Sequence, residues 1–113
     1  MKEADVIVAA LVQSDGAEKR RPAIILREMP PYGDFLVCGV STQLHQRVDG
    51  FDDLILSTDA DFGRSGLLSS SLIRLGFLAV LPRNRIVGTI GSLSPDRHAR
   101  LLRRLSAHLT SAL

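Results

Sequence analysis

Short apolar runs, separated by polar segments that often contain glycine or proline, make up most of the chain. Runs of this length that include β-branched residues are typical of buried β-strands. We therefore expect strands at 5–12, 22–27, 35–41, 53–56 and 86–93. The segment 67–77 is ambiguous, but the alternation from Leu72 to Leu75 favours a strand in which Arg74 points away from its neighbours.

The connections between the expected strands carry turn-forming residues. Glycine adopts positive φ at no steric cost and proline fixes φ, so both interrupt regular structure. The expected connections are a polar loop at 13–21 with a turn at Ser14-Asp15-Gly16, a turn at 28–34, an irregular segment at 42–61 around the short strand, a tight link at 62–66, and a turn at Pro82 and Asn84. The first three strands follow one another closely enough to form a meander.

One helix is expected, at the end of the chain. Ser94 is a favourable N-cap and Pro95 is a natural first helical residue. Leucines then recur at helical spacing, while the arginines fall largely outside that stripe: Leu101, Leu102, Leu105, Leu109 and Leu113 against Arg100, Arg103 and Arg104. The helix should therefore pack its leucines on the strands and expose a basic side. Short strands followed by a terminal helix favour a mainly β fold of the α+β class, a small barrel formed by one domain over residues 1–113.

Composition narrows the class of protein. The hydrophobic fraction of 45% predicts a folded chain, and the scarcity of aromatic residues, at 4%, predicts an aliphatic core with few platforms for base stacking. No apolar run is long enough to span a membrane and the N-terminus does not resemble a signal peptide, so we expect a cytoplasmic protein without membrane contact. Cys38 is the only cysteine, which excludes an internal disulfide, and its apolar neighbours predict a buried thiol.

The charges are unevenly distributed along the chain. The segment 47–64 contains five aspartates, and the segment 74–104 contains seven arginines against Asp96 alone. The net charge is only +2. The asymmetry suggests a charged partner for the basic half, although a charged surface in contact with solvent alone is the alternative.

A basic stretch that ends in a proline-led strand carries the candidate chemistry. Lys19-Arg20-Arg21 precedes Pro22, and Pro22 favours an extended conformation at Arg21. We expect Arg21 where a flexible loop meets a rigid strand, with an exposed guanidinium whose planar donors match a phosphate. A solvated basic loop is the alternative.

Two hydroxyl groups, on Ser41 and Thr42, close the third expected strand. An arginine and a hydroxyl at neighbouring strand ends could both reach one phosphate, and phosphodiester cleavage without a metal needs charge neutralisation and proton transfer. RNA carries its own nucleophile in the 2′-OH group, so these residues permit a ribonuclease. The histidines show no metal-ligand spacing, no phosphate-binding loop occurs, and nothing resembles the nucleophile elbow of a Ser-His-Asp hydrolase. We therefore expect no metal and no cofactor.

The order of the motifs resembles the MazF/PemK-like toxins of type II toxin–antitoxin systems. The resemblance covers nearly the whole chain: Asp5-Val6-Ile7-Val8, Arg20-Arg21-Pro22-Ala23-Ile24-Ile25-Leu26, Val40-Ser41-Thr42-Gln43, Ser65-Gly66-Leu67, Ser70-Ser71-Leu72-Ile73-Arg74-Leu75 and Ile90-Gly91-Ser92-Leu93-Ser94. It implies an SH3-like barrel, a homodimer, and a metal-independent endoribonuclease that cleaves single-stranded RNA and is inhibited by an antitoxin with an acidic tail. The first strand departs from the family pattern at Ala9-Ala10-Leu11-Val12, where relatives commonly carry an aromatic-proline segment.

The resemblance also implies roles for individual residues. Arg21 matches the catalytic arginine that precedes the proline, and Ser41 best matches the second catalytic group, with the neighbouring Thr42 as its rival. The RNA 2′-OH would attack and leave a cyclic phosphate and a 5′-OH. Four further residues are expected to bind RNA: Lys19, Arg20, Gln43 and Arg74. The alternative function is a catalytically inactive SH3-like barrel that binds a protein or inhibits an enzyme by docking.

Overall fold

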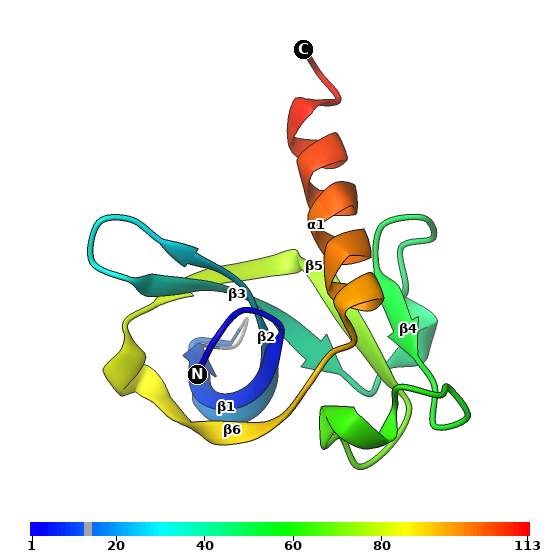
Figure 1. The fold of residues 1–113 in the computed structure, drawn as a ribbon, viewed down its shortest axis with the longest axis horizontal. Coiled ribbons are helices and arrows are strands. Elements are labelled where there is room, and N and C mark those ends of the chain that lie inside the picture. The colour runs from blue at the N-terminus through cyan, green and yellow to red at the C-terminus, as the bar shows by residue number, and fades with distance from the viewer. Residues whose placement is uncertain (13–14) are drawn as a thin grey trace.

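A curled antiparallel sheet and a C-terminal helix form the fold (Figure 1). The structure is a computed structural model that describes residues 1–12 and 15–113. Within these residues the sheet has six strands, and their bounds are β1 Asp5–Val12, β2 Glu18–Met29, β3 Asp34–Ser41, β4 Asp53–Ile55, β5 Ser71–Leu81 and β6 Ile86–Ser92. The helix α1 spans Pro95–Thr110, and short 3₁₀ turns occur at Leu44–Gln46, Gly63–Ser65 and Arg83–Arg85. The predicted mainly β, α+β barrel-like class is therefore confirmed.

The strand order is β4-β5-β3-β2-β1-β6, with antiparallel pairing at every step. The first three strands are consecutive neighbours, so the predicted meander is confirmed. The ambiguous segment is also a strand, but β5 starts at Ser71 and continues to Leu81, beyond the expected end at Phe77. The expected turn at 13–21 is described only from Asp15, because Gln13 and Ser14 lie outside the described residues; Gly16 has a φ of +84° there.

Strand β2 begins earlier than predicted. The proline was expected to start the strand, but β2 starts at Glu18, so Lys19, Arg20 and Arg21 lie within it rather than in a loop. The reason is the length of β1, which continues to Val12 and pairs with the basic residues of β2. Arg21 is therefore held within a strand, paired with Ala9 of β1, more rigidly than a loop would hold it.

Two clusters of mainly aliphatic side chains form the core on opposite faces of the sheet. One lies between the sheet and the helix and includes Ile24, Leu26, Ile73, Leu93 and Leu101. The other lies inside the curl of the sheet and includes Ile7, Ala9, Ile25, Phe35 and Val37. Cys38 is fully buried in the first cluster, as predicted, and burial raises the pKa of its thiol to about 12, so this thiol stays protonated and unreactive at neutral pH.

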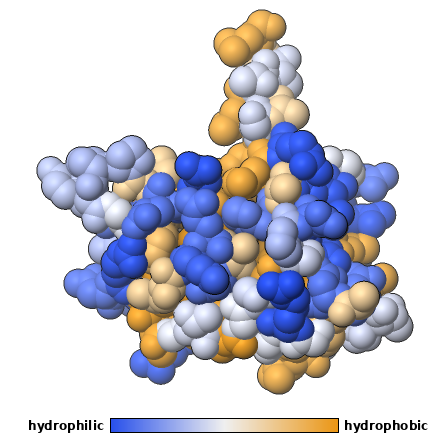
Figure 2. Space-filling model, in the orientation of Figure 1, coloured by the Kyte–Doolittle hydropathy of each residue, from blue (hydrophilic) through white to orange (hydrophobic). Residues whose placement is uncertain are grey.

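Helix α1 starts as predicted but extends beyond the sheet. The Ser94 hydroxyl accepts a hydrogen bond from the backbone N–H of Arg97 at 3.2 Å, and Pro95 is the first helical residue. Only the first part of the leucine stripe is buried: Leu101 and Leu105 are in the core, whereas Leu109 is 68% exposed. Figures 1 and 2 show the last turns projecting from the domain with hydrophobic residues at their end. In the described part of the chain no helix is long and apolar enough to cross a membrane.

The aspartates of the irregular segment and the arginines of the helix pair with each other. We call this group, formed by Asp53, Asp59, Asp61, Arg97 and Arg100, the Arg97 cluster. The Arg97 guanidinium donates to Asp53 Oδ2 at 2.7 Å, to Asp59 Oδ2 at 3.1 Å and to both carboxylate oxygens of Asp61 at 2.8 and 2.9 Å. Arg100 adds a bond to Asp53 Oδ2 at 3.1 Å.

The Arg97 cluster corrects where the sequence placed the basic surface. The uneven charge suggested a charged partner for the basic half, but the acidic segment and the basic helix largely neutralise one another inside the molecule, so the helix is not the main basic surface. Arg100 and Arg104, expected on a solvent-exposed side of the helix, both bond to Asp53 instead, and Arg104 also donates to the carbonyl oxygen of Asp52 at 2.8 Å. The distribution of charged residues along the sequence therefore does not show which of them lack an oppositely charged partner in the structure.

The packing of the Gly63–Ser65 turn against β6 depends on Gly66, which follows the turn. A β-carbon added to Gly66 would overlap the carbonyl oxygen of Ile90, and the φ of +72° at this position is strained for any residue with a side chain. We expect Gly66→Ala to lower the free energy of unfolding by at least about 2 kcal/mol, measured by urea denaturation. Gly63→Ala, where nothing lies within 4 Å of the added carbon, is the matched control. Equal urea midpoints for the two variants would contradict this packing.

Candidate nucleic-acid site

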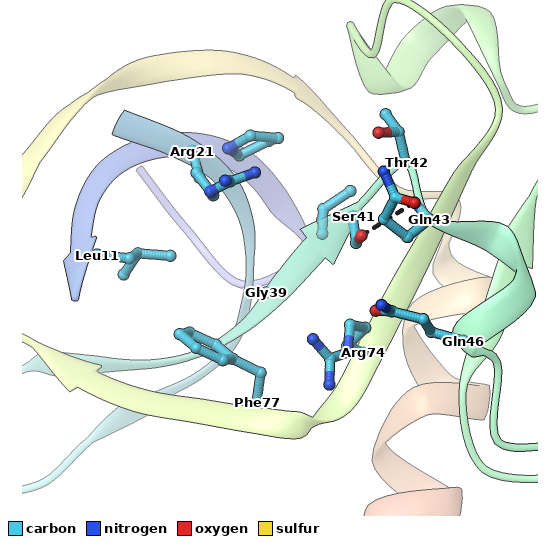
Figure 3. Close-up of a pocket in the computed structure, with 11 residues that line it drawn as sticks. Leu11, Arg21, Gly39, Ser41, Thr42, Gln43, Gln46, Arg74 and Phe77 are labelled. Atoms are coloured by element: carbon cyan, nitrogen blue, oxygen red, sulfur yellow. Dashed lines mark hydrogen bonds between the residues drawn. The ribbon is translucent and has the colours of Figure 1, made fainter. Parts of the chain in front are cut away.

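A cavity of about 250 Å³ opens where β2 and β3 separate (Figure 3). Its lining comes mainly from β2, β3 and β5, with contributions from β1 and the Leu44–Gln46 turn. The lining residues are Leu11, Arg21, Pro22, Gly39, Val40, Ser41, Thr42, Gln43, Gln46, Arg74 and Phe77. Strands therefore supply the two arginines of the cavity.

The strand register brings Arg21, Ser41 and Arg74 to the same face of the sheet. Strands β2 and β3 pair from Met29↔Asp34 as far as Ala23↔Gly39, and Pro22, without an N–H group, comes next. Continuing this register by two residues places Arg21 across from Ser41. On the other side of β3, Arg74 pairs with Gly39, so its side chain shares the face of Ser41.

The cavity carries positive charge that no carboxylate offsets. Among the described residues, neither Arg21 nor Arg74 forms an ion pair, whereas Arg97, Arg100 and Arg104 are all paired with aspartate. No aspartate or glutamate is among the described residues that line the cavity. Two unpaired guanidinium groups in a concave site attract an anion, and their planar donors suit a phosphate.

Ser41 presents its hydroxyl to the cavity in a defined orientation. Its Oγ accepts a hydrogen bond from the backbone N–H of Gln43 at 3.0 Å, which leaves its proton available for donation to an anion. In Figure 3 Ser41 points into the cavity, whereas Thr42 lies at its edge. Ser41 is partly buried and Thr42 is exposed. Ser41 is thus the better placed of the two hydroxyls to act together with Arg21.

The structure brings together most of the predicted site residues. Arg21, Ser41, Thr42, Gln43 and Arg74 all line the cavity. The remaining two predicted residues do not: Lys19 lies further along β2, opposite Leu11, and Arg20, opposite Ala10, projects from the other face of the strand.

Six lining residues were not predicted as site residues: Leu11, Pro22, Gly39, Val40, Gln46 and Phe77. Pro22 and Val40 are direct neighbours of Arg21 and Ser41, whereas Leu11, Gln46 and Phe77 come from other parts of the chain. Leu11 lies opposite Lys19 in the β1–β2 pair, so the length of β1 was the signal for it. Phe77 belongs to the same strand as Arg74, but only the irregular pairing of that strand brings it to the cavity. Gln46 lies in a segment that the sequence marked only as irregular.

Comparison with known protein families gives a match over nearly the whole chain. A family described as PemK-like, MazF-like toxin of type II toxin–antitoxin system matches residues 2–109, a range that contains every residue of the cavity. No curated protein matches the chain. Because the family match covers almost the entire sequence, the chain belongs to the PemK-like, MazF-like toxins of type II toxin–antitoxin systems.

Proposed function

We propose that this toxin is a metal-independent endoribonuclease that cleaves single-stranded RNA through attack by the RNA 2′-OH. The observation that carries the proposal is the shared cavity of Arg21 and Ser41, in which a second arginine adds charge and no described carboxylate opposes it. Membership of the toxin family supports the same conclusion, since these toxins are generally endoribonucleases.

The proposed reaction uses the substrate's own nucleophile. The 2′-oxygen attacks the adjacent phosphorus, the bond to the 5′-oxygen breaks, and the products are a 2′,3′-cyclic phosphate and a 5′-OH. The 2′-OH loses one proton and the leaving 5′-oxygen gains one, so no water is consumed. Arg21 neutralises the charge that develops on the phosphorane and assists the proton transfer, and the Ser41 hydroxyl donates to a phosphate oxygen.

The proposed partners follow from charge and exposed apolar surface. An acidic segment of an antitoxin would be attracted to the same basic cavity and would inhibit RNA cleavage by occupying it. We place this interaction in the cytoplasm. The exposed Leu109 and Leu113 at the projecting end of α1 support a homodimer, in which a second copy covers them. Sedimentation of a monomer at all concentrations would contradict the homodimer.

Incubation of the purified chain with single-stranded RNA of random sequence in EDTA tests the activity. We expect fragments that carry a 5′-OH and a 2′,3′-cyclic phosphate. Intact RNA, from a preparation shown by mass spectrometry to contain no antitoxin, would instead favour the inactive barrel that binds a protein or inhibits an enzyme.

The roles of the two hydroxyls can be separated by single substitutions. Ser41→Ala removes the hydroxyl that faces the cavity, and we expect a decrease in kcat of about 10²-fold, the scale of losing one donor to a transition-state oxyanion. Thr42→Ala should lower kcat by much less, and both variants should unfold at the urea concentration of the parent. A larger loss for Thr42→Ala would move the second catalytic group by one residue.

A further inference from the structure

The cavity has a polar end and an apolar end. In Figure 3 Leu11 and Phe77 lie on one side and Ser41 and Gln46 on the other; Arg74 lies between Phe77 and Gln46, and Arg21 lies across the cavity from Phe77. We propose that the apolar end holds a nucleobase of the RNA, stacked on the ring of Phe77, while the adjoining phosphate lies between Arg21 and Ser41. The inference rests on the proposed function and names a residue that positions its substrate.

A β-bulge in strand β5 brings Phe77 to the cavity. Cys38 of β3 pairs with Leu78, but the next residue, Gly39, pairs with Arg74, so residues 75–77 have no partner in β3. Extra residues of this kind bend a strand and redirect its side chains, and such bulges are frequent beside functional sites. Arg74 and Phe77, which regular alternation would place on opposite faces, consequently both line the cavity.

Gly39 makes the position of the ring possible. A β-carbon on Gly39 would lie 2.9 Å from Cδ1 and 3.3 Å from Cγ of Phe77, closer than van der Waals contact allows. The ring thus lies directly on the backbone of β3, and it also packs beside the core cluster of Ile25, Phe35 and Val37. It is only partly buried, and the exposed remainder contributes to the cavity wall.

The side chains at the apolar end of the cavity are better suited to a nucleobase than to a second phosphate group of the RNA. Phe77 is the only aromatic side chain among the described residues of the cavity, and neither it nor Leu11 can neutralise an anion. Every nucleobase has a π-face that stacks on an aromatic ring, and such stacking does not depend on sequence. The Arg74 guanidinium lies within the same cavity, where its donors can meet acceptor atoms on the edge of the stacked base.

Binding of an oligonucleotide that cannot be cleaved tests the proposal separately from the nuclease activity. The probe is a fluorescent single-stranded RNA of mixed sequence with 2′-fluoro riboses, which lack the nucleophile, and the readout is the Kd from anisotropy. We expect Phe77→Leu, which keeps an apolar side chain but removes the ring, to raise Kd about 5- to 150-fold. Phe77→Tyr should restore binding to within about threefold of the parent.

Two controls distinguish stacking from a structural role. The Leu variant should unfold at nearly the urea concentration of the parent. With an abasic probe of the same length and charge, the parent and Phe77→Leu should bind equally weakly. Equal affinity of parent and Phe77→Leu for the base-containing probe, or no binding of that probe by the parent, would overturn the proposal. A chain that binds the probe through Phe77 but never cleaves RNA would support the base site and refute the nuclease.

Discussion

Replacement of Arg21 by alanine should reduce the rate of RNA cleavage by at least about 10³-fold, the largest loss expected for any single side chain of the cavity. The guanidinium faces the cavity, is not neutralised by a described carboxylate, and is proposed to balance the charge that develops on phosphorus. Its effect should appear in kcat, because the charge on the phosphate is greater in the transition state than in the bound substrate. Single-turnover cleavage of one defined RNA substrate in EDTA measures it.

Two further variants separate the specific role of Arg21 from a general effect of positive charge. Arg21→Lys keeps the charge but loses the planar donor fork, so it should recover only part of the lost rate. Arg103→Ala removes an exposed arginine of α1, outside the cavity and without a described partner, and should cleave at the parental rate. If Arg103→Ala were as damaging as Arg21→Ala, non-specific attraction between the protein and RNA would explain both losses.

Replacement of Arg97 by alanine should destabilise the fold by about 3–5 kcal/mol, because among the described residues it leaves Asp61 without an arginine partner and Asp53 with only Arg100 and Arg104. The Arg97 side chain is only 8% exposed and the Asp53 side chain only 7%, so water cannot take over the lost interactions. Urea denaturation at neutral pH measures the effect. The exposed Arg103→Ala serves again as the control and should stay within about 0.5 kcal/mol of the parent.

The Arg97 cluster should also determine how stability responds to acid. The hydrogen bonds from Arg97 hold the pKa of Asp61 well below its usual range. A carboxyl group with a lowered pKa in the folded state contributes stability above its unfolded pKa of about 3.9, and this contribution is lost as the pH falls below that value. The parent should therefore become steadily less stable below about pH 4. Arg97→Ala should show a flatter decline over the same range, and identical slopes would contradict this assignment.

Much of the fold could be predicted because local patterns agreed with it. The apolar run at 5–12 became β1 with the same bounds, and Ser94 followed by Pro95 marked the start of α1. The start of β2 could not be predicted from Pro22, since pairing with the long β1 overrides the local signal of a proline after three cations. The position along α1 at which its leucines become exposed could not be predicted either, because it depends on where the sheet ends beneath the helix.

The candidate site was partly predictable for a similar reason. Ser41 ends β3, a boundary that the sequence indicates, and Arg21 directly precedes Pro22, next to the point where β2 and β3 stop pairing. Their meeting could therefore be expected, although Arg21 lies within β2 and not at its start. Phe77 could not be predicted, because it faces the cavity only through a β-bulge, and a bulge is a property of two strands together. The partners of Arg97 and Arg100 were hidden as well, since they come from a segment some forty residues away whose path has no regular pattern.

The end of the β2–β3 ladder has a consequence for how the site tolerates change. Because neighbouring side chains of a strand face opposite ways, deleting one residue between Asp34 and Gly39 would turn the hydroxyl of Ser41 away from Arg21 and offer the isopropyl group of Val40 or the side chain of Thr42 in its place. Insertions at the hairpin tip near Tyr32, which is 88% exposed, would leave that geometry intact. Homologous sequences should thus vary freely in length at the tip while preserving an invariant number of residues along the strand itself.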